Sequence, residues 1–375
     1  MRRGADMKAS NLFEPVDLGP LRLANRWVVA PMTRVSATID GQATPRMARY
    51  YADFAAGGFG LVITEGIYTD RAYSQGYLFQ PGLAADAQRD AWRPVVAGVH
   101  AAGGRIVAQL MHAGAISQGN AHRAVAKGPS AVQLAGVQMS FYRGEGPYRM
   151  PEAMTLAEIT AAIDGFAAAA LRAREAGFDG VELHGANGYL LDQFLTEHTN
   201  RREDGYGGAL VQRLRLGVEV ITAVREAVGA GFPVGYRVSQ GKVNDFGHKW
   251  RGAEADAALV FRALSAAPID YLHTTEFEAW QPAFGEGPSL AALARRYGSV
   301  PVIANGSLHD PARAAGMVAR GEADLIALGR GALSNADWPR RVRDGLPLEE
   351  FDRALLSPLA DLANADRRRA RTARA

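Results

Sequence analysis

Short segments rich in strand-forming residues alternate with longer helical segments along the whole chain, and this alternation constrains the fold more than any other feature. A helix between two strands is the usual connection of a parallel sheet, so the pattern predicts an α/β protein. Eight strand segments are expected, the number that closes a (β/α)8 TIM barrel: Trp27–Met32, Gly60–Glu65, Arg105–Met111, Gly180–His184, Pro233–Val238, Tyr271–Thr275, Pro301–Asn305 and Asp324–Leu328.

Helical segments fill the spaces between these strands. One begins at Thr155-Leu-Ala-Glu158, the spacing of a capping box, and runs to Ala176. An open doubly wound sheet would show the same alternation, but it usually carries a glycine-rich nucleotide motif, and neither G-x-G-x-x-G nor G-x-x-x-x-G-K-[ST] occurs. The other expected helices are Ala43–Ala56, Asp86–Ala102, Ala209–Val228, Ala253–Ala266, Ser289–Tyr297, Pro311–Arg320 and Asp337–Asp344.

The chain is expected to form a single domain, because no linker rich in Pro, Gly or Ser divides it. We expect an N-terminal arm at residues 1–11, the barrel at residues 12–346 and a C-terminal segment at residues 347–375 that ends in an arginine-rich tail. The segment Ala113–Pro151 follows the third strand and breaks the regular alternation. A barrel would place it as a lid over the carboxyl ends of the strands, where active sites lie.

Composition excludes several classes of protein. The chain has no cysteine, which excludes a disulfide scaffold, a thiolate zinc site, a cysteine nucleophile and a cysteine-ligated iron–sulfur cluster. The formal charge is +3, and five arginines fall within Arg367–Ala375. We interpret this run as a solvated, disordered terminus, with nucleic-acid or anionic-lipid binding as the alternative. No segment has the roughly 18 apolar residues that span a bilayer, so a soluble, cytoplasmic protein is expected.

The last two strand ends carry the residue types that bind phosphate. Barrels often bind phosphate through the loops after strands seven and eight. Here these loops hold Gly306-Ser307 and Gly329-Arg330, two flexible backbone positions with a hydroxyl and a forked cation. We therefore predict a phosphate site at these four residues, the alternative being two glycine turns with a surface arginine.

Polar residues also gather at the ends of the fourth and fifth strands. His184 and Asn187 can both donate hydrogen bonds to one carbonyl oxygen, and Tyr189 can deliver a proton to the adjacent carbon. Arg237 ends an otherwise apolar strand, and a buried arginine needs a partner. We predict an anionic ligand as that partner, and a structural ion pair with Glu65 is the alternative.

These strand ends contain five motifs that resemble the Old Yellow Enzyme family of NAD(P)H:flavin oxidoreductases. The resemblance covers roughly Leu12 to Leu346, and the long motif that contains His184 is its most specific part. The motifs are Ala30-Pro31-Met32-Thr33-Arg34, Ile63-Thr64-Glu65-Gly66, Gln109-Leu110-Met111-His112-Ala113-Gly114, His184-Gly185-Ala186-Asn187-Gly188-Tyr189-Leu190-Leu191-Asp192-Gln193-Phe194-Leu195 and Asn200-Arg201-Arg202-Glu203-Asp204-Gly205-Tyr206-Gly207-Gly208.

The resemblance implies a TIM barrel that holds noncovalent FMN and uses NADH or NADPH as hydride donor. By the family pattern, its cofactor-binding residues are Ala30, Pro31, Met32, Thr33, Gly66, Gln109, Arg237, Gly306, Ser307, Gly329 and Arg330. It also implies that His184 and Asn187 hold the carbonyl or nitro group of an α,β-unsaturated substrate. Hydride would pass from flavin N5 to the β carbon, and Tyr189 would protonate the α carbon.

The sequence departs from the family pattern at several positions. Met111 stands where many relatives have tryptophan, and Thr33 is the threonine variant of a position that is cysteine in other relatives. The segments around Ser239–Gly247 and Phe277–Phe284 do not match well-known members. We predict Trp280 as a substrate-binding residue. Four aromatic residues could equally line the pocket mouth or pack the loops: Tyr142, Tyr148, Trp280 and Phe284.

Other functions remain as alternatives at this point. A family member could act as a flavin-dependent desaturase, or on nitro compounds or nitrate esters, because the same donor pair can hold several electron-withdrawing groups. A flavin-free barrel lyase would need a buried lysine or a metal site; Lys242 is the only lysine near a strand end, where we expect it to be solvated, and no metal-ligand spacing is present. We expect no metal, no nucleic-acid or membrane partner, and a small-molecule substrate, with the choice between monomer and homo-oligomer open.

Overall fold

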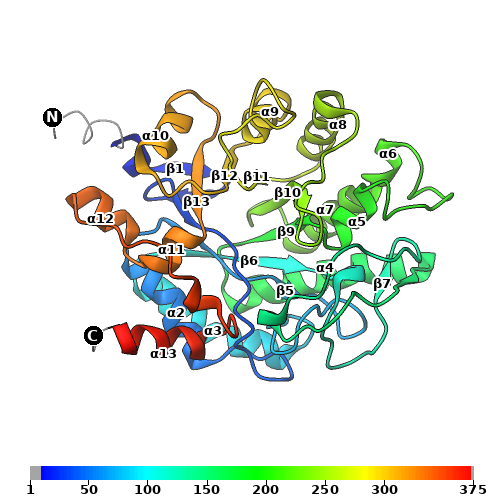
Figure 1. Cartoon of the computed structure of the whole chain (residues 1–375), viewed down its shortest axis with the longest axis horizontal. Coiled ribbons are helices and arrows are strands. Elements are labelled where there is room, and N and C mark those ends of the chain that lie inside the picture. The colour runs from blue at the N-terminus through cyan, green and yellow to red at the C-terminus, as the bar shows by residue number, and fades with distance from the viewer. Residues whose placement is uncertain (1–9, 373–375) are drawn as a thin grey trace.

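Eight parallel strands close into a barrel in the structure, a computed structural model that describes residues 10–372 (Figure 1). Each strand pairs with the next in the chain, and the last pairs with the first. The predicted (β/α)8 barrel is therefore confirmed, with every expected strand present. The strands are β3 (Trp27–Val29), β4 (Leu61–Ile63), β6 (Arg105–Met111), β9 (Gly180–Asn187), β10 (Val234–Lys242), β11 (Tyr271–Thr275), β12 (Val302–Asn305) and β13 (Leu325–Leu328).

Side chains alternate between the two faces of the barrel wall, as the pleat of a strand requires. In β3, Val28 packs in the barrel interior, whereas Trp27 packs against the outer helices. The same alternation directs Gln109, Glu182 and Arg237 of neighbouring strands inward, and register pairs Arg237 with His184 on one side and His273 on the other. The sequence of each strand thus determines which polar groups meet inside the barrel.

Helices cover the outside of the barrel at the expected places. The capping box of α4 is complete, because Glu158 N–H donates to Thr155 Oγ1 at 3.2 Å and Thr155 N–H donates to the Glu158 carboxylate at 2.8 Å. The single helix expected over Ala209–Val228 is divided at Leu214 into α6 (Leu210–Arg213) and α7 (Arg215–Val228). The other covering helices are α2 (Pro45–Ala56), α3 (Asp86–Ala101), α4 (Leu156–Ala176), α8 (Ala253–Ala266), α9 (Leu290–Tyr297), α10 (Pro311–Ala319) and α12 (Trp338–Asp344).

A short hairpin closes the amino-terminal end of the barrel. Its strands β1 (Val16–Leu18) and β2 (Leu21–Leu23) direct Leu18, Leu21 and Leu23 into the apolar barrel interior. Gly19 at the turn contacts Asp270, the residue just before β11. The interior is therefore filled with apolar side chains at this end, and the polar side chains lie toward the other.

The long segment after β6 forms the expected lid. It leaves the barrel at Ala113 and returns through β8 (Glu152–Ala153), which pairs with β7 (Lys127–Gly128) near its base. Toward its tip, the Tyr142 hydroxyl donates to the carbonyl oxygen of Thr33 at 3.2 Å. The lid thus reaches the loop that follows β3.

The prediction that the C-terminal segment ends in a disordered tail is wrong for the residues that the structure describes. Residues Leu362–Thr372 form helix α13, which lies beside α2 (Figure 1) and is tied to it by an ion pair between Arg46 and Asp366 at 3.0 Å. The arginine-rich run is thus helical as far as Thr372 and not a disordered tail; its residues 373–375 and residues 1–9 of the predicted N-terminal arm lie outside the described residues. The domain boundaries at residues 12 and 346 stay predictions. Within residues 10–372, no helix combines the length and apolar character that crossing a bilayer requires.

Candidate active site

A cavity of about 590 Å³ opens at the carboxyl ends of the strands. It brings together residues from β9, β10 and the loops after β11, β12 and β13. Five predicted site residues line it: Asn187, Gly306, Ser307, Gly329 and Arg330. The four residues expected to bind phosphate therefore share this cavity with Asn187, whereas His184 and Tyr189 are not among its lining residues.

The predicted phosphate loops form a compact polar cradle on one wall of this cavity. Gly306 has φ +143°, and a Cβ there would lie 2.1 Å from the carbonyl oxygen of Glu276, so only glycine fits. Ser307 Oγ donates to the carbonyl of Phe277 at 2.7 Å and accepts from the Arg330 guanidinium. A cation and a hydroxyl are thus fixed side by side at the cavity surface.

Arg237 is buried in the barrel beneath the cavity. It donates to Asn305 Oδ1 at 2.8 Å, while its Nε has no partner among the described residues. Burial lowers the pKa of Arg237 to about 10, although the nearby Glu182 carboxylate opposes the shift. The alternative ion pair with Glu65 is wrong: the Glu65 carboxylate instead accepts from the backbone N–H groups of Arg34 and Val35 at 2.8 and 3.1 Å.

A buried network around Glu182 supports this arginine. Gln109 Nε2 donates to one Glu182 oxygen and His273 Nδ1 contacts the other, both at 2.8 Å. Despite the cost of burial, the histidine, arginine and amide hold the pKa of Glu182 below its ordinary value. No role for His273 was predicted from the sequence, and the signal that could have indicated one is the inward position that it shares with Arg237.

His184, Asn187 and Tyr189 lie together where β9 ends. The rings of His184 and Tyr189 are 4.7 Å apart. Asn187 adopts φ +60°, a left-handed conformation that asparagine tolerates, and its N–H donates to Ser239 Oγ at 2.8 Å. The predicted cluster is therefore present, with a sharp turn of the backbone between its members.

Burial sets the protonation states in this cluster. It lowers the pKa of His184 well below 6.5, and the positive Arg237 acts in the same direction, so the ring is neutral at pH 7. Its Nδ1 accepts from the N–H of Ala186 at 3.4 Å, which leaves Nε2 as the donor nitrogen. Burial also raises the pKa of Tyr189 to about 12, so its phenol carries a proton.

Tyr77 contacts Tyr189 directly and was missed at the sequence level. Their hydroxyl oxygens are 2.6 Å apart and buried. Tyr77 lies in the loop after β5 (Ile67–Tyr68), far from Tyr189 in the chain and outside any motif, so no local pattern indicated it. The lid tyrosines Tyr142 and Tyr148 pack in the same cluster, as does Met111, the residue that replaces the family tryptophan.

Lys242 is buried and ion-paired, which corrects the expectation of a solvated lysine. Strands β9 and β10 run further than predicted, and a register shift pairs Lys242 with Asn187. Lys242 Nζ contacts both oxygens of Asp192 at 2.6 and 2.7 Å, and Asp192 also accepts from Gly188 N–H at 2.6 Å. This ion pair holds the backbone next to Asn187 from two sides.

The remaining predicted residues lie around the cavity or away from it. Residues 30–33 follow β3, and the side chain of Met32 lies beside Gly329. Gly66 contacts Met111. Trp280 stacks on Arg313, whose guanidinium carbon is 3.8 Å from the ring centre, and Trp280 is not among the residues that line the cavity.

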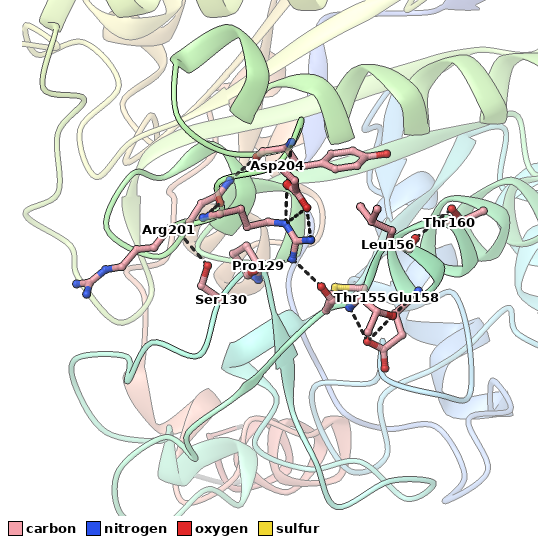
Figure 2. Close-up of polar contacts among 12 residues, drawn as sticks. Pro129, Ser130, Thr155, Leu156, Glu158, Thr160, Arg201 and Asp204 are labelled. Carbon is pink, nitrogen blue, oxygen red and sulfur yellow. Dashed lines mark hydrogen bonds and ion pairs between the residues drawn. The ribbon is translucent and has the colours of Figure 1, made fainter.

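Arg202, which lies between β9 and α6, contacts the lid just after β7 and again just after β8. Its guanidinium donates to the carbonyl oxygens of Pro129 and Met154 at 3.0 and 2.6 Å, and also contacts the Asp204 carboxylate. Figure 2 shows these contacts, together with the side chain of Arg201, which extends away from the group. The motif that contains Arg202 thus serves to anchor the lid.

Comparisons with known proteins identify the family. A sequence model of the NADH:flavin oxidoreductase / NADH oxidase family matches residues 11–349. The chain is 32% identical over 344 residues to an NADH oxidase of Thermoanaerobacter brockii; this match covers 89% of the chain and 51% of that protein, about half its length. It is 35% identical over 350 residues to a probable flavin mononucleotide-dependent alkene reductase of Leishmania infantum, with 92% and 93% covered.

A solved structure agrees with these sequence relatives. The old yellow enzyme homologue from Zymomonas mobilis superposes with a TM-score of 0.85 at 34% identity, over 93% of this chain and 97% of that one. The chain therefore belongs to the Old Yellow Enzyme family of NADH:flavin oxidoreductases. It is an oxidoreductase built on the barrel that its sequence predicts.

Within the described residues, no group of three or more histidines, aspartates and glutamates is arranged to hold a metal ion.

Proposed function

We propose that this protein is an FMN-dependent ene-reductase that uses NADH or NADPH to reduce the C=C bond of α,β-unsaturated carbonyl or nitro compounds. The observation that carries the proposal is the juxtaposition of the cradle and Asn187 on one cavity with the buried cluster of His184 and Tyr189 beside it. The alkene reductase and NADH oxidase named above support the same chemistry.

The residues present fit FMN. The cradle at Gly306, Ser307, Gly329 and Arg330 offers a cation and close backbone approach to a phosphate. Arg237 keeps an unpartnered N–H and a positive charge under the cavity, which suits the electron-rich ring of a reduced flavin. The chemistry that FMN supplies when bound is hydride transfer from N5, after the flavin has taken that hydride from NADH or NADPH.

The residues around Ala30–Thr33, Gly66 and Gln109 would flank the flavin ring in this proposal. Residues 30–33 follow β3, Gly66 follows β4 and Gln109 lies within β6, and these three strands are neighbours in the barrel. Gln109 is fixed by its hydrogen bond to Glu182, so its orientation does not depend on a ligand. A rigid wall of this kind reduces the conformational cost of binding the ring.

His184 and Asn187 would hold the substrate oxygen. A neutral histidine with Nε2 as donor can hydrogen-bond a carbonyl oxygen without carrying its own charge, and it favours negative charge that develops there. Asn187 is braced by Ser239 and by the Lys242–Asp192 pair on either side of its turn. Two fixed donors on one oxygen polarise the conjugated alkene.

Tyr189 would deliver the proton to the α carbon. Its phenol is protonated at neutral pH, and its hydroxyl is within hydrogen-bond distance of Tyr77, which can orient it and replace the lost proton. The buried surroundings of both tyrosines exclude water from this transfer.

The first test is the absorption spectrum of the purified protein, followed by heat release of any chromophore. We expect flavin bands, FMN in the supernatant and NADH- or NADPH-dependent reduction of a simple enone. A colourless protein that also fails to take up added FMN would contradict the proposal.

The second test separates the two half-reactions. Tyr189→Phe should slow oxidation of the reduced protein by an enone by roughly 10²-fold or more, while reduction by NADH or NADPH stays near the wild-type rate. Tyr148→Phe is the matched control, because the Tyr148 hydroxyl is buried in the same cluster but has no hydrogen-bond partner among the described residues. Equal losses in both half-reactions would show that Tyr189 is not the proton donor.

A further inference from the structure

A second, smaller cavity lies between α2, α11 (Arg330–Ser334) and the C-terminal helix α13. Its volume is about 110 Å³, and none of its lining residues belongs to the 590 Å³ cavity described above. Apolar side chains such as Leu333 and Leu362 form part of its wall, and the rest is dominated by arginine.

Arg34 reaches this cavity from the barrel and is 1% exposed. Its Nη2 donates to the carbonyl of Asp361 at 3.3 Å, but Nε and Nη1 have no partner within residues 10–372. A buried cation with two unused donors is costly unless an acceptor is present. The unused donors of Arg34 therefore point to a ligand that accepts hydrogen bonds.

The other polar groups of the cavity favour a negatively charged ligand. Four arginines line it against two carboxylates, which leaves two positive charges in excess: the cations are Arg34, Arg46, Arg49 and Arg369, and the carboxylates are Asp53 and Asp366. The Tyr50 hydroxyl is also buried without a partner in the described chain. Burial raises the pKa of Tyr50 to about 12, so the hydroxyl keeps its proton and remains a donor.

We propose that this cavity binds a small inorganic oxyanion of the size and charge of phosphate. A volume of about 110 Å³ exceeds the roughly 30 Å³ share of a single water molecule, and guanidinium groups match tetrahedral oxyanions in geometry. A divalent anion would balance the excess charge and accept from Arg34 and Tyr50. The cavity is too small for a nucleotide or a flavin.

The bound anion would join the C-terminal helix to the barrel. Arg49 and Tyr50 come from α2, Arg369 comes from α13, and Arg34 follows directly after Thr33, a residue that we place beside the flavin. An anion held by all of them would connect α13 to the loop after β3. The proposal does not depend on the enzymatic activity, because it concerns a separate cavity.

The test is a phosphate titration of the FMN-saturated protein at constant ionic strength, followed by calorimetry and by the unfolding temperature. In the proposed function FMN occupies the cradle at Gly306 and Arg330, so phosphate binding at the cradle would not contribute to this titration. We expect saturable binding that Arg49→Gln and Arg369→Gln each weaken at least ten-fold. The matched control is Arg367→Gln, which removes one positive charge from an exposed position of α13 that does not line the cavity.

Three outcomes would overturn the proposal. A rise in unfolding temperature that never saturates and is equal in all variants would be a general effect of salt exclusion. Saturable binding that survives in both cavity variants but is lost in Arg330→Gln would place the phosphate in the flavin cradle. The absence of measurable binding by calorimetry would exclude the site directly. Arg49 and Arg369 are both exposed residues, so both variants should fold.

Discussion

Burial fixes the charge of the individual residues around the candidate active site. His184 is neutral and Tyr189 is protonated at pH 7, because burial in the barrel disfavours the charged form of each side chain. Arg237 keeps its charge, and its hydrogen-bond partner among the described residues is Asn305. The site thus presents neutral donors where a carbonyl would bind and a cation where a reduced flavin would need one.

Replacing His184 and Asn187 together by alanine tests the donor pair. We expect kcat/KM for an enone to fall by roughly 10⁴-fold, since each of the two oxyanion donors contributes about 3 kcal/mol in comparable sites. The FMN content should stay at the wild-type level, which spectroscopy measures in the same sample. Loss of FMN would mean that these two residues hold the cofactor site together.

Glu65→Gln tests the charge state of a buried carboxyl. Burial raises the pKa of Glu65 to about 7, so the stability that this group contributes is complete below its unfolded pKa of 4.5 and is lost as pH rises through 7. The shift corresponds to about 3 kcal/mol. We expect Glu65→Gln to lose less stability than the wild type between pH 5 and pH 8, measured by urea unfolding.

The matched control is Glu350→Gln, an exposed carboxyl elsewhere on the surface. It should leave the pH dependence of unfolding unchanged. The same slope in the wild type and in Glu65→Gln would show that Glu65 ionises as an ordinary carboxyl.

At the scale of elements, Arg202 determines how firmly the lid is held. Arg202→Gln removes the donors to Pro129 and Met154 and leaves Asp204 without its cation. We expect amide hydrogen exchange in the β7–β8 region to accelerate about ten-fold or more, because hydrogen bonds to charged groups contribute about 1.5–3 kcal/mol. The KM for the enone should rise as the lid loosens.

Arg201→Gln is the neighbouring control, since the Arg201 side chain extends away from the lid and only its backbone N–H contacts Ser130 (Figure 2). Equal exchange rates in the two variants would mean that charge, rather than the anchoring contacts, holds the lid.

The sequence predicted most of the elements and part of the site. Strands and helices alternate in the chain itself, so the eight barrel strands and the capping box at Thr155 could be predicted from local patterns. The burial of Lys242 could not be predicted from a local pattern, because it results from a register shift between β9 and β10 and from an ion pair with Asp192 on another element. Tyr77 and the partner of Arg237 also depend on contacts between distant segments, which no local pattern encodes.

At the scale of the whole molecule, the apolar residues that stabilise the barrel and the residues of the candidate active site lie at opposite ends of the barrel. Leu23 is fully buried in the hairpin that closes the amino-terminal end, on the opposite side from the cavity. Leu23→Ala should lower the free energy of unfolding by roughly 2–4 kcal/mol without changing kcat/KM for an enone. Leu346→Ala, at a position that is 53% exposed, is the control and should change neither quantity. A parallel loss of activity in the folded Leu23→Ala protein would contradict this separation.

The anchoring of the lid also bears on how such a protein can diversify. Arg202 hydrogen-bonds the chain at Pro129 and again at Met154. These contacts fix the two ends of the stretch between them. Exposed positions of that stretch, such as Val137 and Met150, can therefore vary without moving the two anchored ends. A lid grafted from a relative would keep these anchor points, but it would also have to keep Tyr142 and Tyr148 to preserve the surroundings of Tyr189.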